Sequence, residues 1–180
     1  MSQLTVSDEP VRAYRGKIDV SGAYPTTQVS GLAVGNIVVG DGVGREVGDV
    51  DPGAGVATGG QTARAFQGTD LFLGVAPSDP SQLVALPGET FGQYTAAESF
   101  PIVRKGRVWV VTADVVDDLS KAVFIRNANA GGSPPAEQLG AFRATTVADY
   151  VDLSALAAVA WVAGVTIGGV NFGLLELNLP

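Results

Sequence analysis

The chain has 180 residues, of which 46% are apolar and 16% are charged, a balance that favours one folded core over disorder. It contains neither cysteine nor histidine, which excludes disulfides, thiolate nucleophiles, Cys/His zinc sites and histidine acid–base chemistry, so we expect no cofactor and no metal ion. A net charge of −7 argues against binding to nucleic acid or to an anionic membrane, and favours a protein partner.

The beginning of the chain predicts an arm followed by a single β domain. Residues 1–10 are short, polar and closed by Pro10, a pattern typical of an extended N-terminal arm. The 24 glycines and 10 prolines, together with abundant valine, favour short strands with tight connections over residues 11–180. The first strand is expected over Ala13–Val20, where apolar and polar side chains alternate.

The next third of the chain alternates between strands and loops. Gln28–Val39 is apolar but interrupted by glycines, which predicts two short strands or one bent strand. Asp41–Gly60 is rich in glycine and has no sustained period, so it is expected to form a long surface loop. Leu71–Ala76 predicts a compact strand that ends at Pro77–Pro80, and a second loop is expected to extend to about Ser99.

The strongest strand signal in the chain is Arg107–Ala113. Trp109 and Val111 fall on one face of this strand, and Val108 and Val110 fall on the other. A strand that is apolar on both faces must be covered on both sides, by the rest of the domain or by another protomer.

The last part of the chain predicts further strands and one helix. Ala122–Arg126 is a strand candidate, and Asn127–Pro135 is expected to be a turn or loop. Gly140–Thr146 and Phe172–Leu179 are interpreted as a final pair of strands, and Val147–Val159 as the one plausible short helix. In the final strand, one face is expected to carry Leu175, Leu177 and Leu179. The fold class predicted from these elements is mainly β, a small β-barrel or β-sandwich with long glycine-rich loops.

The uncharged stretch Leu153–Leu175 is long enough to span a membrane as a helix. Its glycines and alanines dilute the apolarity, Asn171 lies inside it, and the nearest charged residues are acidic instead of basic. We therefore expect no membrane span.

Two patterns that resemble chemical sites have simpler interpretations. Gly40–Gly44 superficially resembles a phosphate-binding loop, but no Lys-Ser/Thr pair and no helical pattern follow it, so a flexible loop is favoured. The pairs Asp49 with Asp51 and Asp117 with Asp118 lack the spacing of a calcium loop, and adjacent residues of a strand point to opposite faces. Turn carboxylates are the favoured interpretation, and a catalytic site is not predicted.

Two further groups could contact a partner. Arg104, Lys105 and Arg107 surround the glycine before the strongest strand, and they could bind an acidic surface or a phosphate, or form a solvated strand edge. Trp109 and Trp161 could stack on a sugar or a base, but both lie in apolar runs, which favours burial in the core or in a subunit interface.

Several stretches together resemble one known family. In chain order they are Tyr14–Gly22 (YRGKIDVSG), Leu73–Ala76 (LGVA), Arg104–Val110 (RKGRVWV), Ala160–Trp161 and Leu174–Leu177 (LLEL). Their residues and their order resemble the structural cement protein family, the capsid cement or decoration proteins of tailed bacteriophages.

This resemblance implies a structural virion protein without enzymatic activity. Such a protein would be made in the host cytoplasm, bind the outer capsid surface between major capsid protein subunits and stabilise the head. It is expected to form a homotrimer whose N-terminal arm reaches neighbouring subunits. The residues hypothesised to contact the capsid or another protomer are Leu4, Val6, Tyr14, Arg15, Arg104 and Arg107.

Two alternatives from other classes remain at this point. A β-sandwich module of a virion that binds carbohydrate or a host surface would require exposed aromatic residues on one face. An enzyme that relies on carboxylates would require the fold to bring two acidic residues together, with Asp49, Asp51, Asp117 and Asp118 as the candidates.

Overall fold

The structure is a computed structural model that describes residues 13–19, 25–46, 61–78, 92–128, 138–154 and 158–180. Within these ranges the chain forms twelve strands and no α-helix, which confirms the prediction of a mainly β fold. The strands are β1 (Thr27–Ala33), β2 (Ile37–Val38), β3 (Gly42–Arg45), β4 (Gln61–Ala65), β5 (Leu71–Val75), β6 (Gln93–Tyr94), β7 (Ser99–Thr112), β8 (Phe124–Arg126), β9 (Phe142–Arg143), β10 (Tyr150–Asp152), β11 (Val159–Ile167) and β12 (Val170–Asn178).

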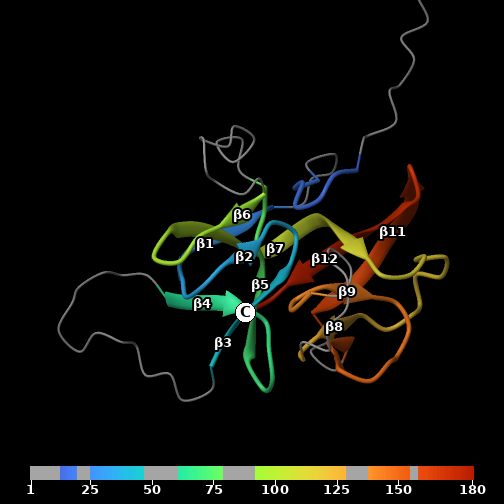
Figure 1. Ribbon diagram of the computed structural model, residues 1–180. Helices are drawn as coiled ribbons and strands as arrows, with labels where there is room; N and C mark the ends of the chain where they lie inside the picture. The colour runs from blue at the N-terminus through green and yellow to red at the C-terminus, as the bar shows by residue number, and fades with distance from the viewer. Residues whose placement is uncertain (1–12, 20–24, 47–60, 79–91, 129–137, 155–157) are drawn as a thin grey trace, which may run out of the picture.

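Five strands close into a barrel (Figure 1). β1 pairs with β4 in parallel, and β4–β3, β3–β5 and β5–β7 follow as antiparallel pairs. β7 then returns to β1 as an antiparallel partner, which completes the ring. Closure leaves no free sheet edge within these five strands, so the barrel is complete without a partner chain.

The barrel encloses its own small core. Phe100 and Ile102 of β7 point inward and pack with Ile37 from the separate β2–β6 ribbon. Tyr94 stacks against Phe100 with ring centroids 5.0 Å apart, and its hydroxyl donates to the carbonyl of Pro77 at 2.7 Å. The cluster of buried residues consists of Ala33, Ile37, Val39, Val43, Ala63, Leu73, Ala76, Tyr94, Phe100 and Ile102.

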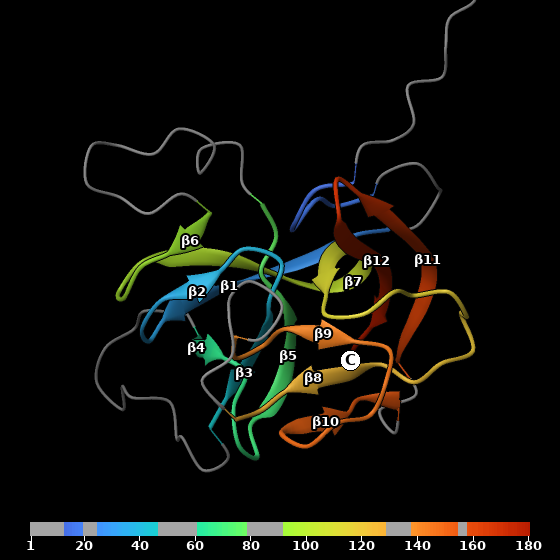
Figure 2. The ribbon, with the colours of Figure 1, turned by 45° about the vertical axis from the view of Figure 1, so that its right-hand side comes forward.

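The second half of β7 leaves the barrel and becomes part of a different sheet. There it pairs with β12 in a register that runs from Lys105 opposite Asn178 to Thr112 opposite Asn171. β12 in turn forms a hairpin with β11 (Figure 2). On the other side of β7, the chain at residues 16–19 adds a short antiparallel segment through Ile18 and Val108. One long strand therefore joins the barrel to the hairpin.

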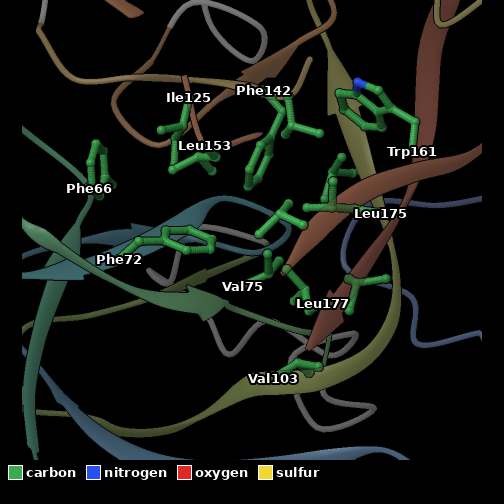
Figure 3. Close-up of a cluster of buried hydrophobic side chains, with 14 of the residues drawn as sticks. Phe66, Phe72, Val75, Val103, Ile125, Phe142, Leu153, Trp161, Leu175 and Leu177 are labelled. Atoms are coloured by element: carbon green, nitrogen blue, oxygen red, sulfur yellow. The ribbon is translucent and has the colours of Figure 1, made fainter. Parts of the chain in front are cut away.

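The larger core lies between the barrel strand β5, the β7–β12–β11 sheet and the short strands β8, β9 and β10 (Figure 3). Phe142, Ile125 and Leu175 are fully buried there, and the Trp161 indole donates to the carbonyl of Ala122 at 3.2 Å. The buried residues of this cluster are Phe66, Phe72, Val75, Val103, Val108, Val110, Val116, Val123, Ile125, Phe142, Ala144, Leu153, Val159, Trp161, Leu175, Leu177 and Leu179.

Several predictions about strands are confirmed. β5, β8 and β12 lie where the sequence pattern placed them, and the expected interruption within Gln28–Val39 separates β1 from β2. Both faces of β7 are covered, with Val108 and Val110 in the larger core and Trp109 in a third, small cluster. The shared face of the last strand is also confirmed, because Leu175, Leu177 and Leu179 all belong to the larger core.

The predicted helix over Val147–Val159 is wrong. Tyr150–Asp152 is strand β10, the backbone N–H of Leu153 donates to the carbonyl of Val123 at 2.8 Å, and Val159 begins β11. Pairing with β8 and β12 thus outweighs the weak helical spacing of the leucines. Residues 155–157 lie outside the described part.

Two other expectations need correction. Gly140–Thr146 and Phe172–Leu179 do not pair with each other, because β9 pairs with β8 and β7 while β12 pairs with β7 and β11. Asp41–Gly60 is not wholly a surface loop, because Gly42–Arg45 is the buried strand β3. Glycine is needed there for close packing, since a Cβ on Gly42 would lie 2.1 Å from a side-chain carbon of Ile125.

The remaining segments are shorter than expected or fall outside the described residues. The strand expected over Ala13–Val20 is reduced to the pairing at residues 16–19. The predicted arm over residues 1–10, the rest of the glycine-rich segment at 47–60, and residues 79–91 and 129–137 of the other two predicted loops lie outside the described ranges. In the part of the chain that is described, no helix has the length and apolarity needed to cross a membrane.

Candidate interaction surface

The outer face of the β7–β12–β11 sheet is the surface on which several candidate residues meet. Leu175 and Leu177 point into the larger core, so by strand alternation Phe172 and Leu174 point the opposite way. Residues paired across the sheet share this side. We call this side the hairpin face, and its residues are Arg107, Trp109 and Val111 of β7, Ala160, Ala163, Val165 and Ile167 of β11, and Val170, Phe172, Leu174 and Glu176 of β12.

The middle of the hairpin face is buried by the start of the described chain. Ala13 packs on Trp109 and Leu174, and the segment is held by hydrogen bonds of 2.8 Å from the Gly16 N–H to the Trp109 carbonyl and from the Trp109 N–H to the Lys17 carbonyl. The Trp109 indole N–H is buried and has no hydrogen-bond acceptor among the residues that the structure describes. Ala13 and the residues that follow it are therefore fixed on this face.

One end of the hairpin face is polar. Arg107 donates through Nε and Nη2 to one carboxylate oxygen of Glu176 at 2.8 Å, directly across from it in the β7–β12 register. Tyr14 lies outside this end, at the turn closed by the hydrogen bond from the Lys17 N–H to the Tyr14 carbonyl. It is exposed, and the Lys17 ammonium lies 5.3 Å from the centre of its ring. Both acidic and basic groups at this end are thus engaged within the chain.

The other end is apolar and exposed. Val165, Ile167 and Val170 are 38%, 43% and 40% exposed, and they surround the tight turn at Gly168 and Gly169. Both glycines adopt positive φ angles, +59° and +82°, which the two-residue hairpin turn requires. We call Val165, Ile167 and Val170 the hairpin tip.

A buried carboxylate ties the N-terminal segment to the rest of the fold. Asp41, between the ribbon strand β2 and the barrel strand β3, accepts hydrogen bonds from the Arg15 guanidinium and from the Gln138 amide. The Asp41 backbone N–H and C=O bond to Val38 and Ala76. Burial raises the pKa of Asp41 to about 7, although the Arg15 charge opposes this rise. Asp41 therefore connects three otherwise separate parts of the chain.

The contact residues hypothesised from the sequence divide into three groups. Arg107 lies at the polar end of the hairpin face, whereas Tyr14 is exposed on the segment at residues 13–19, where the neighbouring Arg15 turns toward Asp41. Arg104 is half-buried where the β1–β7 register shifts, and its Nε has no acceptor among the described residues. Leu4 and Val6 lie outside the described part of the chain.

The residues considered for chemistry are not brought together. Asp117 is exposed and pairs with Lys121, and Asp118 is exposed and accepts from the Ser120 hydroxyl and N–H; these bonds lower the pKa of both carboxyls. Asp49 and Asp51 lie outside the described residues. Within the described ranges no group of three acidic residues is placed to hold a metal ion.

The other two patterns are explained by packing. In Gly40–Gly44 the first glycine lies close to Arg15, and Gly42, Val43 and Gly44 belong to the buried strand β3, so the segment is neither the flexible loop expected from the sequence nor a phosphate loop. Trp109 and Trp161 are both buried, as their apolar sequence context indicated. The hairpin tip was missed by sequence reasoning, although its signal was present: an uncharged stretch with a Gly-Gly turn at its centre.

Comparison with known proteins supplies the family. Residues 2–177 match the family described as structural cement protein (E217 gp24/Pam3 gp6), and the chain belongs to this family. Among solved structures, a chain of "The capsid of Myoviridae Phage XM1" has a similar fold, with a TM-score of 0.61 and 14% identity over 99% of this chain and 98% of that one. No curated protein matches the chain.

Family membership confirms the resemblance seen in the sequence. The protein is a structural component of a phage virion that associates with the outer surface of the capsid and cements it. No finding favours the alternative of a carbohydrate-binding module. The fold supports a structural role, because a closed barrel and a larger second core give a rigid body around one continuous strand.

Proposed function

We propose that the protein binds between major capsid protein subunits as a homotrimer and stabilises the assembled shell without catalysing a reaction. A cement protein stabilises by mass action, because binding free energy that is available only on the closed lattice opposes subunit dissociation. In a trimer the second and third protomers dock at high effective concentration, so modest contacts add up to lasting attachment.

The observation that carries this proposal is the anchoring of residues 13–19 on the rigid sheet. Three backbone hydrogen bonds of 2.8 Å join Gly16, Lys17 and Asp19 to β7, and the Arg15–Asp41 ion pair fastens the same segment to the barrel side. An arm formed by residues 1–10 would thus begin at a defined position, which lowers the entropy lost when it engages a neighbouring subunit. Leu4 and Val6 are the apolar residues that we assign to this contact.

Tyr14 and Arg104 are the described residues that fit a contact with the capsid most simply. Tyr14 is exposed and presents an aromatic ring beside the origin of the arm. The Nε–H of the Arg104 guanidinium donates no hydrogen bond to any described residue and could therefore donate one to a partner. Arg15 and Arg107 already hold ion pairs with Asp41 and Glu176, so we assign them the positioning of the segment and of the strand edge.

The test is reconstitution on shells that lack the protein. Purified protein should bind such shells to saturation and raise the temperature at which they rupture, measured as bound copies per shell and as calorimetric midpoint. Absence of binding to intact shells, or turnover of a small substrate by the purified protein, would contradict the proposal.

The same assay can measure how much the N-terminal arm contributes to shell binding. Deletion of residues 1–10 should weaken attachment by about tenfold or more, because a trimer loses three contacts at once. The double substitution L4S/V6S keeps the length and charge of the arm and should reproduce most of the loss. Occupancy that is unchanged by either variant would remove the arm from the mechanism.

A further inference from the structure

The hairpin tip combines three exposed apolar residues that are contiguous. Ile167 lies directly opposite Val170 in the β11–β12 register, and Val165 lies opposite Phe172, which is itself half-buried. Isolated apolar residues are common on protein surfaces, but a contiguous group on one rigid face is typical of an interaction site. Continuous pairing of β11 with β12 up to the turn presents these side chains in a fixed arrangement.

The tip offers no polar group that would select a different kind of partner. On the opposite side of the same hairpin end, the Thr166 hydroxyl donates to the Asn171 side-chain oxygen at 2.8 Å, so these two polar side chains bond to each other. No charged residue occurs between Leu153 and Leu175. Specific recognition of a foreign protein surface usually depends on complementary charges or on hydrogen bonds, and the tip provides apolar contact alone.

The charge of the whole chain indicates which partner suits such a surface. Each copy carries a net charge of −7, so two copies repel each other wherever their charged surfaces approach. An uncharged apolar surface is where copies can come into close contact at the least electrostatic cost. We infer that the hairpin tip is an interface between copies of this chain. This inference rests on the proposed function in one respect, since it identifies the surface through which the proposed homotrimer is held.

The rest of the hairpin face agrees with this assignment. Its middle is covered by the segment that begins at Ala13, and its far end carries the Arg107–Glu176 pair. The large apolar side chains of this face that are exposed among the described residues are therefore those of the tip.

The experiment compares I167D with the matched control L71D in sedimentation velocity at several micromolar concentrations. Ile167 and Leu71 are both exposed apolar residues on strands, at 43% and 52%, and Leu71 belongs to the barrel. Wild type and L71D should self-associate, while I167D should dissociate ~30-fold or more readily because it places like charges against each other. Far-UV circular dichroism and the thermal midpoint report whether each variant is folded, and V170K replaces I167D if the latter does not fold.

The outcomes separate this inference from the proposed function, because shell binding is measured on the same samples. A wild-type chain that is monomeric, or an I167D variant that associates like wild type, overturns the inference. If the wild type is monomeric and I167D loses shell binding, the tip contacts the capsid instead. If I167D changes neither self-association nor shell binding, the chain's own N-terminal residues are the better candidate to cover the tip. Self-association that depends on Ile167 without any binding to shells would support the inference and contradict the proposed function.

Discussion

The barrel and the hairpin sheet share strand β7 but differ in how completely they are closed. In the barrel, β7 is flanked by β1 and β5, and every strand of the ring has two neighbours. In the hairpin sheet, β12 has partners on both sides, whereas β11 pairs with β12 alone among the described strands. The barrel thus satisfies its backbone and buries its core internally, and the hairpin sheet keeps an edge and an apolar tip at the surface.

We infer from this difference that the barrel provides stability and that the hairpin provides a contact surface. A closed barrel resists deformation because its core is packed from all sides and its hydrogen bonds have no exposed end. A hairpin extending from it can present a contact surface without weakening that core. Substitutions in the barrel should consequently lower mainly the free energy of unfolding, and substitutions on the hairpin face should weaken mainly self-association.

The largest effect is expected from a direct comparison of two phenylalanines. Phe100 is 1% exposed in the barrel core, and F100A should lower the free energy of unfolding by about 3–5 kcal/mol because it leaves a cavity. Phe172 is half-buried on the hairpin face, so F172A should cost about 1–2 kcal/mol in unfolding and also weaken self-association. Urea denaturation and sedimentation velocity measure the two quantities.

Equal effects of the two substitutions would contradict the distinction between the barrel and the hairpin. If F100A and F172A destabilised the fold equally and neither changed association, the hairpin would have to be treated as part of one common core. F100L, which retains most of the side-chain volume, serves as the control for a cavity effect and should recover most of the loss.

The next largest effect concerns Asp41, which joins the two regions. Its folded-state pKa of about 7 is above the ordinary value of 3.8 because burial disfavours the charged form, so the folded chain holds this proton more tightly than the unfolded chain. The resulting stability is fully present below about pH 4 and is lost as pH rises through about 7. Urea unfolding of wild type minus D41N should show a slope on the order of 1 kcal/mol per pH unit in this window.

The charged and polar groups that face Asp41 provide the control. Arg15 lowers the pKa and Gln138 stabilises the carboxylate by a hydrogen bond, so R15M should move the transition to higher pH. Equal pH dependence of wild type and D41N would show that Asp41 stays charged throughout, held by Arg15 against the cost of burial.

The strands that the sequence predicted best are those whose pattern is decided locally. β7 combines β-branched and aromatic residues over its second half, and β5 is a short apolar run ended by Pro77, so neither depends on distant contacts. β3 and β11 were missed because their glycines indicate turns or flexibility when the surroundings are unknown. Gly42 is in fact packed against Ile125, and a Cβ on Gly164 would lie 2.0 Å from the Val116 carbonyl oxygen.

The candidate surface was predicted in part for a similar reason. The sequence placed Trp109 in a strand covered on both faces, and residues 16–19, which follow Tyr14 in the chain, pair with the part of β7 that contains Arg107. The pairing of Arg15 with Asp41 depends on a contact between segments far apart in the chain. No local period carries information of that kind.

The smallest effect is expected from the ion pair that ends the hairpin face. Arg107 and Glu176 are partly exposed and directly opposed on β7 and β12, so a double-mutant cycle of R107M, E176Q and the combined variant should give a coupling of about 0.5–1 kcal/mol. The coupling should decrease in high salt, measured by urea unfolding, because solvent ions screen a pair of this exposure. A coupling near zero would mean that the Arg107–Glu176 pair makes this end of the face polar but does not stabilise the sheet. In that case association through the tip should still depend on Ile167, since the contact between copies draws on apolar burial and not on this pair.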